Sequence, residues 1–319
     1  MILTPEIVTI EIINAIFVVF ATITFVISLR IVLLWENDSY SPLQYKLQLQ
    51  SYLAATIIKF ILYIKILLFI FFVYTLDNIA TLLPGAMCGA GVVNATVYGT
   101  PLLFLKIINL YLFAYWIVLH NQDMHTKNQK YIRLKFMLFI VVYFLFMSEI
   151  ALETLMFYNI DILKVVDCCG SIFKTTDGSY LSSILSISDA IMLKVFYALY
   201  GLMIVVFFFK NRYIFSILNL LFVIVALISL ITFFGTYIYE LPTHHCPFCL
   251  LQRDYNYIGY LLYILLFLGT FNGLVLGFID FDINTQVKKY KFALFFNGIY
   301  VVIVSYYVMS YFLKNGVWL

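Results

Sequence analysis

Long runs of apolar residues recur along the whole chain and are separated by short polar segments. Each run holds at least about 18 residues, enough for a helix to cross a hydrocarbon core about 30 Å thick. All the prolines fall between the runs or in the first turn of one, where a missing N–H costs a helix little. The pattern predicts an all-α, polytopic membrane protein with about eight spans, at 9–34, 50–76, 100–120, 136–158, 189–209, 214–238, 257–280 and 293–313.

The composition supports this class, because the chain has too little polar surface to enclose a water-soluble core. Of its 319 residues, 64% are hydrophobic and 11% are charged, and the mean hydropathy is +1.02. No segment between spans is long enough for a separate soluble domain. We expect three membrane regions: an N-terminal region at 1–135, a bundle at 136–280 and a last span within 281–319.

Lysine and arginine determine the expected orientation, because they stay on the cytoplasmic side of short loops. Placing the N-terminus outside leaves most of these residues between spans in the cytoplasm. We therefore expect both termini outside, in a bacterial inner membrane. The formal net charge of +3 then reflects this topology, so it gives no reason to expect nucleic acid as a partner.

All five cysteines fall in the predicted outer loops, and the predicted inner loops contain none. Cysteine often behaves simply as a small hydrophobic residue. The outer side of a bacterial inner membrane is oxidising, however, so thiols there tend to be disulfides, redox-active pairs or metal ligands. The five are Cys88, Cys168, Cys169, Cys246 and Cys249.

Several charged residues lie inside the predicted spans, most of them in the outer half. Each costs at least about 2.5–3.5 kcal/mol to insert, so they should face the bundle and pair with one another. Glu149 and Glu153 are four residues apart and share a helical face. We expect an intramembrane polar cluster that combines these carboxylates with Lys65, Lys106 and Lys194.

The segment HHCPFCLLQR, residues 244–253, concentrates the chemistry of the outer loops. We expect it to run directly into the next helix, with Pro247 in the first turn and a thiol near the positive end of the helix dipole. Arg253 follows Cys249 by four residues, so a helix would place both on one face at the membrane interface.

CPFCLLQR resembles the Cys-x-x-Cys-x-x-Gln-Arg signature of the DsbB family, which passes electrons from periplasmic thiols to quinone. The resemblance implies that Cys246 and Cys249 form the redox-active disulfide and that Arg253, with Gln252 beside it, contacts a quinone. The fourth to seventh spans are also similar in order to the vitamin K epoxide reductase family. That similarity gives Cys168 and Cys169 the place of the loop cysteines that pass electrons on.

Two other interpretations remain open, so the sequence does not decide whether the chain is an enzyme. Copper or zinc could be held by His244, His245, Cys246 and Cys249 in a metal carrier or a factor that assembles metal cofactors. The chain could also be a subunit of a larger membrane complex with structural disulfides. The expected partners are the lipid bilayer and an extracytoplasmic protein that carries either thiols or metal.

Overall fold

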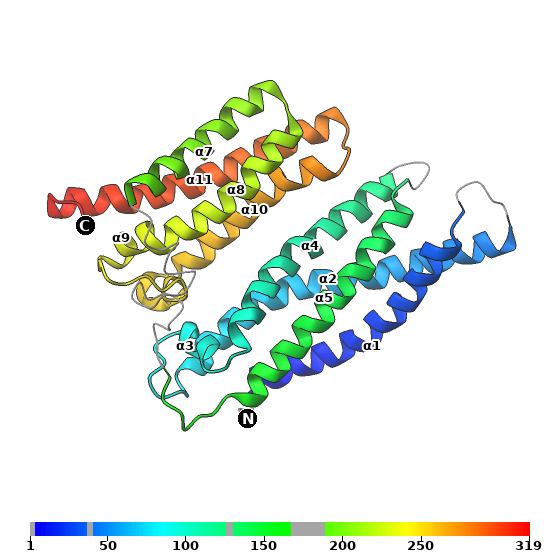
Figure 1. The fold of residues 1–319 in the computed structure, drawn as a ribbon, viewed down its shortest axis with the longest axis horizontal. Helices are drawn as coiled ribbons and strands as arrows, with labels where there is room; N and C mark the ends of the chain where they lie inside the picture. Colours follow the sequence, from blue (N-terminus) through cyan, green and yellow to red (C-terminus); the bar gives the residue numbers. More distant parts are fainter. Residues whose placement is uncertain (1–3, 37–40, 126–129, 167–188) are drawn as a thin grey trace. The chain divides into compact units, whose positions relative to one another are not determined.

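The computed structural model describes residues 4–36, 41–125, 130–166 and 189–319, and every regular element in these ranges is helical (Figure 1). Eight helices are long and apolar enough to cross a membrane, which confirms the all-α class and the number of spans within the described residues. The chain is therefore an integral membrane protein. The long helices are α1 (Pro5–Leu34), α2 (Pro42–Ala80), α4 (Gly99–His125), α5 (Ile132–Asn159), α7 (Asp189–Phe209), α8 (Arg212–Ser229), α10 (Ile258–Phe278) and α11 (Ile283–Asn315).

Several helices begin at polar caps outside the apolar runs. Ser41 caps α2 by accepting a hydrogen bond from the amide of Gln44, and Pro42 occupies the first helical position. Asp282 caps α11 in the same way through the amide of Thr285. Because these caps lie well before the apolar runs, α2 and α11 begin earlier than the predicted spans at 50 and 293.

The chain divides into two compact units, Met1–Val166 and Asp167–Leu319. In the first unit α1 packs on α2 and α5, and α4 packs on the same two helices, so the four form a closed bundle. The short helix α3 (Gly89–Asn94) lies in the connection between α2 and α4 and contacts both.

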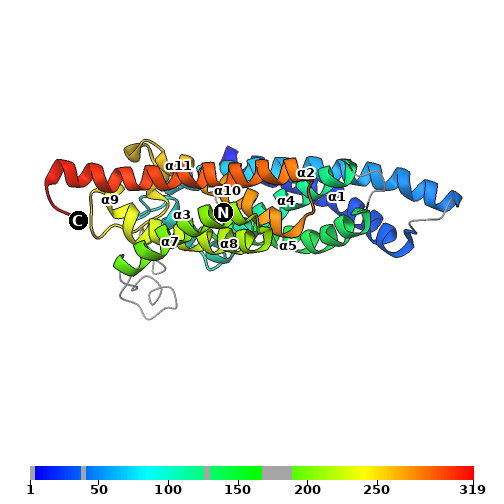
Figure 2. The same cartoon turned by 90° about the horizontal axis from the view of Figure 1, so that it is seen from above.

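The second unit repeats this order of packing. Helix α8 packs on α7 and α10, and α11 packs on the same two. Figure 2 shows α11 along its full length. Helix α8 continues through a π-helical turn, η2 (Leu230–Phe234), into α9 (Gly235–Tyr239). In both units the cysteines that the structure describes lie in the long connection between the second and third long helices.

The boundary between the units differs from the expected domain boundaries at 135 and 280. Helix α5 belongs to the first unit, since it packs on α1 and α4. The charged residues on α5 explain this placement, because they pair with lysines of α2 and α4. The last span, α11, joins the second unit through its packing on α10 and α7.

Small residues bring the helices of the second unit close together. A Cβ added at Gly273 of α10 would lie 2.1 Å from the side chain of Asn219 on α8. One added at Gly269 would lie 2.1 Å from the side chain of Asn297 on α11. The two asparagines bond each other, since Asn297 Nδ2 donates to Asn219 Oδ1 at 3.1 Å. These contacts hold α8, α10 and α11 together at one level of the bundle.

Candidate functional site

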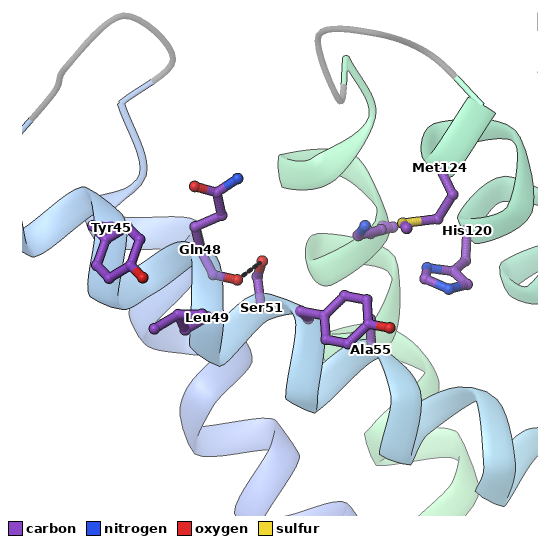
Figure 3. Close-up of a pocket in the computed structure, with 9 residues that line it drawn as sticks. Tyr45, Gln48, Leu49, Ser51, Ala55, His120 and Met124 are labelled. Carbon is purple, nitrogen blue, oxygen red and sulfur yellow. Dashed lines mark hydrogen bonds between the residues drawn. The ribbon is translucent and has the colours of Figure 1, made fainter.

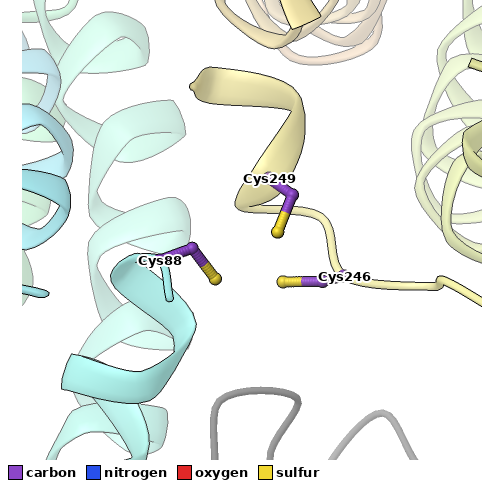
Figure 4. Close-up of side chains that lie close together, drawn as sticks. All are labelled: Cys88, Cys246 and Cys249. Carbon is purple, nitrogen blue, oxygen red and sulfur yellow. The ribbon is translucent and has the colours of Figure 1, made fainter. Parts of the chain in front are cut away.

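The Cys-x-x-Cys motif lies in the loop between α9 and α10. Helix α9 ends because Glu240 takes a left-handed backbone conformation, with φ of 55°. Cys249 then begins a single 3₁₀ turn, η3 (Cys249–Leu251). Figure 4 shows the side chains of Cys246 and Cys249 pointing toward each other. Their Sγ atoms lie within 4.8 Å and both residues are buried.

Two tyrosines fix the backbone of this loop. The hydroxyl of Tyr239, at the end of α9, donates to the carbonyl oxygen of Cys246. The hydroxyl of Tyr263, on α10, donates to the carbonyl oxygen of Pro247 at 2.9 Å. Tyr255 packs edge-on against Tyr239 at 4.7 Å between ring centroids. The loop is thus held from both neighbouring helices, which limits the backbone freedom of the first two motif residues. No sequence pattern marked these tyrosines.

Tyr255 also lies close enough to the motif to respond to its charge. Its partial burial, together with nearby Cys249 and Asp254, raises the pKa of Tyr255. The phenol therefore remains protonated at neutral pH and can act beside the thiols only as a neutral group.

The two histidines before the motif have different surroundings. The ring of His244 packs edge-on against Tyr239, with centroids 4.5 Å apart. His245 Nδ1 lies 3.0 Å from the carbonyl oxygen of Ile231, in the π-helical turn η2. Because a carbonyl can only accept, Nδ1 carries the proton and Nε2 is the basic nitrogen of neutral His245. The π turn, which interrupts the regular helix hydrogen bonds, thereby holds the loop through His245.

The expected continuation of the motif into a helix is wrong. Gln252 has an extended backbone, with ψ of 161°, and separates η3 from a second 3₁₀ turn, η4 (Arg253–Tyr255). Asn256 and Tyr257 then take left-handed conformations, with φ of 54° and 56°, before α10 begins. Neither thiol lies at an α-helix N-terminus, and the helical spacing expected to align Arg253 with Cys249 does not exist. Arg253 is exposed and Gln252 is half-buried.

The remaining cysteines lie in other connections. Cys88, drawn in Figure 4, is the buried residue that directly precedes α3 in the first unit. Cys168 and Cys169 lie outside the described residues, so their proposed role in passing electrons stays a prediction.

Comparison with known proteins identifies no family for this chain. No family model, curated protein or solved structure matches the chain. The resemblance of CPFCLLQR to the DsbB signature therefore rests on these residues alone.

A second group of polar residues lies inside the bundle of the first unit. Lys106 Nζ lies 2.9 Å from carboxylate oxygens of both Glu149 and Glu153. Lys65 Nζ lies 3.0 Å from Glu149. All four side chains are almost completely buried. These ion pairs are among those expected from the sequence, and they form between α2, α4 and α5.

Two asparagines complete the hydrogen bonding of this network. Asn109 Nδ2 donates to Glu149 at 2.6 Å. Asn14, on α1, donates to Glu153 at 2.9 Å and accepts from Lys65 at 3.2 Å. Two ammonium and two carboxylate groups leave the network with no net charge, which is the condition for burying ions at acceptable cost.

The expected cluster also included Lys194, which lies elsewhere. Lys194 belongs to α7 in the second unit, and its side chain is exposed. Three lysines inside spans look equivalent in sequence, so the choice between them depends on which helices pack together. Helix α7 packs on α8 and α11 within the second unit, whereas the network is built from helices of the first.

Proposed function

We propose that this chain is a membrane thiol–disulfide oxidoreductase whose redox-active pair is Cys246 and Cys249. The observation that carries the proposal is the approach of the two thiol sulfurs to within 4.8 Å in a loop fixed by two tyrosine hydroxyls. Two thiols this close, three residues apart in one loop, are candidates to form a disulfide with each other. The oxidising side of a membrane, where we expect the loop to lie, is where such pairs act.

The proposed reaction has two balanced steps. A thiolate of a partner dithiol protein attacks the Cys246–Cys249 disulfide and forms a mixed disulfide, which the partner's second thiol resolves. This step oxidises the partner and leaves two thiols on the chain. Two electrons and two protons then pass from these thiols to a quinone, which becomes a quinol, and the disulfide forms again.

The other cysteines offer a second route, in which the partner first reduces a disulfide among them and the resulting thiolate then attacks the Cys246–Cys249 disulfide. Cys88 follows α2, Cys168 and Cys169 follow α5, and Cys246 follows α9. If each long helix crosses the membrane, the chain returns to the side of its N-terminus before each of these groups. Counting crossings therefore supports a common side for all the cysteines, as an exchange of disulfides between them requires.

Arg253 and Gln252 are the residues proposed to bind the quinone. Arg253 is exposed, so its guanidinium is accessible to a ligand, and its planar set of N–H groups can donate to a carbonyl oxygen. Gln252 is half-buried between the two 3₁₀ turns and follows Cys249 by three residues. A cation at this position would stabilise negative charge as the quinone accepts electrons.

Metal handling is the alternative, and one observation favours it. Because His245 Nδ1 donates to Ile231, its Nε2 is the basic nitrogen that a metal would bind. The sulfurs of Cys246 and Cys249 already lie within 4.8 Å of each other. A rotation of the loop that brought His245 Nε2 to both thiolates would complete a donor set suited to copper(I) or zinc. Such a protein would carry the metal or deliver it to a cofactor under assembly.

The test compares quinone reduction with metal content. Full-length protein, reduced and desalted in detergent, should reduce a short-chain quinone, with one quinone consumed per Cys246–Cys249 thiol pair. Arg253→Ala should slow this step by at least about tenfold, because each 1.4 kcal/mol of lost transition-state stabilisation costs that factor. Quinone absorbance gives the rate, and elemental analysis gives the bound metal.

Lys314→Gln is the matched control, because it also removes an exposed cation of the second unit, one that pairs with the exposed Glu240. It should leave the rate unchanged. Equal rates of quinone reduction for Arg253→Ala and wild type, together with near-stoichiometric copper or zinc, would reject the oxidoreductase proposal and support metal handling.

A further inference from the structure

A pocket of about 300 Å³ opens in the first unit between the beginning of α2 and the end of α4 (Figure 3). Its α2 side carries Ser51 and Ala55, and its α4 side carries His120 and Met124. Lys135 of α5 contributes to the lining. This volume is near the lower limit of small-molecule sites, so the pocket suits a single compact polar group.

His120 is the residue that marks this pocket as a binding site. Its side chain is buried, with 7% of the residue exposed, and its ring stacks on Trp116 with centroids 5.3 Å apart. In the described part of the chain, its Nδ1 atom is buried and has no hydrogen-bond partner. An unsatisfied buried nitrogen is unfavourable, and a ligand that bonds it would recover this loss.

The charges around the pocket do not balance. Lys135 Nζ pairs with Asp123 at 2.6 Å, and that carboxylate also accepts from the amide of Tyr131. Lys59, one turn beyond Ala55 on α2, donates to the side-chain oxygen of Asn121 at 3.0 Å, and an amide carries no charge. Among the described residues, the lining Lys135 and the nearby Lys59 thus supply two ammonium groups for the one carboxylate of Asp123, and this excess of positive charge favours a bound anion.

The outer rim of the pocket is amphipathic. Tyr45 and Tyr52 line it and are each 67% exposed, and Leu49 beside them is 58% exposed. Phenol groups with apolar neighbours are typical of the interface between headgroups and acyl chains. An acyl chain can therefore lie along this face of α2 while its polar group enters the pocket.

We propose that this pocket binds a phosphate group, and that its source is the headgroup of an anionic phospholipid. Lys135 and Lys59 supply the attraction for the anion, and His120 Nδ1 donates a hydrogen bond to a phosphate oxygen. The orientation expected from the lysine and arginine distribution puts this end of α2 at the cytoplasmic leaflet, where basic pockets between helices bind anionic headgroups. The proposal does not depend on the thiol chemistry.

The test measures lipid binding to the full-length protein in a neutral detergent by native mass spectrometry. Phosphatidylglycerol should bind at least about fivefold more tightly than zwitterionic phosphatidylcholine, because one well-placed cation near the surface contributes about 1 kcal/mol. Lys59→Gln should remove most of this difference, and Lys59→Arg, which keeps the charge, should retain it. His120→Phe, which removes the hydrogen-bond donor, should also weaken the binding of phosphatidylglycerol.

Lys46→Gln is the matched control, because Lys46 is an exposed cation near the same end of α2, whereas Lys59 is half-buried and bonded to Asn121, the neighbour of His120. It should leave the preference intact. Equal binding of the two lipids by wild type, or equal losses in Lys59→Gln and Lys46→Gln, would overturn the proposal. Inorganic phosphate is tested separately. If inorganic phosphate binds with the same dependence on Lys59, and phosphatidylglycerol does not displace it, then the pocket binds free phosphate and the proposed lipid headgroup is wrong.

Discussion

Cys246→Ser should abolish thiol–disulfide exchange, lowering the rate of partner oxidation by roughly a thousandfold or more. A serine hydroxyl remains protonated at neutral pH and cannot form a disulfide, so neither step of the proposed reaction can proceed. Cys249→Ser should have the same effect, since each thiol needs the other to close the disulfide. Free thiols on a model dithiol protein, counted over time with excess quinone, provide the measurement.

The control for this pair is His244→Gln, which removes a proposed metal ligand and leaves both thiols. Under the oxidoreductase proposal it should keep most of the exchange activity, because the ring of His244 packs against Tyr239 and takes no part in electron transfer. Cys246→Ser that still oxidises the partner would contradict the proposal. Loss of stoichiometric metal from both variants would favour metal binding instead.

Glu149→Gln should destabilise the protein by about 3–5 kcal/mol, because it leaves a buried positive charge without its counterion. Glu149 is the carboxylate shared by Lys65 and Lys106, and it also accepts from Asn109. Glutamine keeps nearly the same shape, so the loss reports charge rather than packing. The measurement is unfolding in detergent mixtures, followed by circular dichroism.

The matched control is Glu240→Gln, which breaks an ion pair with Lys314 in which both side chains are more than half exposed. An exposed pair contributes about 0–1 kcal/mol, so this variant should unfold close to wild type. If Glu149→Gln is as stable as Glu240→Gln, charge balance is not what holds the first unit together. If the double variant Lys65→Met, Glu149→Leu is more stable than Glu149→Gln, charge balance is supported as the cause.

The membrane spans could be predicted because length and hydropathy alone decide whether a helix can cross a bilayer. Their ends could not be predicted from hydropathy, since polar residues continue α2 and α11 beyond the apolar runs. Local cap signals at Ser41-Pro42 and at Asp282 did mark those ends. The division into units depends on which helices pack together, and no local signal in one sequence determines this.

The candidate thiol site could be predicted only in part. The spacing of Cys246 and Cys249 identified the pair, but the hydroxyl bonds from Tyr239 and Tyr263 depend on how two helices face the loop. The helix expected through Arg253 does not form, because Gln252 has an extended backbone and Asn256 and Tyr257 then adopt left-handed conformations before α10. Asparagine tolerates this conformation, so Asn256 is a sequence signal for an interruption before α10.

The ionic network shows the same limit. Burial cost required that lysines and glutamates within spans pair, and the shared face of Glu149 and Glu153 identified the acceptors. The lysines that reach them were set by packing between helices, which left Lys194 exposed in the other unit. Asn14 and Asn109 were missed because single asparagines in apolar runs are too common to identify a network.

A redox titration of the motif cysteines tests the oxidoreductase proposal most directly. Wild-type protein is equilibrated in thiol–disulfide buffers of graded potential, its free thiols are alkylated, and the peptide that contains Cys246 and Cys249 is weighed. The proposal predicts that both cysteines of this peptide become alkylated together, in one two-electron transition that reverses on adding quinone. The proposal would be contradicted if both thiols were alkylated at every potential. Protection of both thiols from alkylation by added copper or zinc would then point to metal binding.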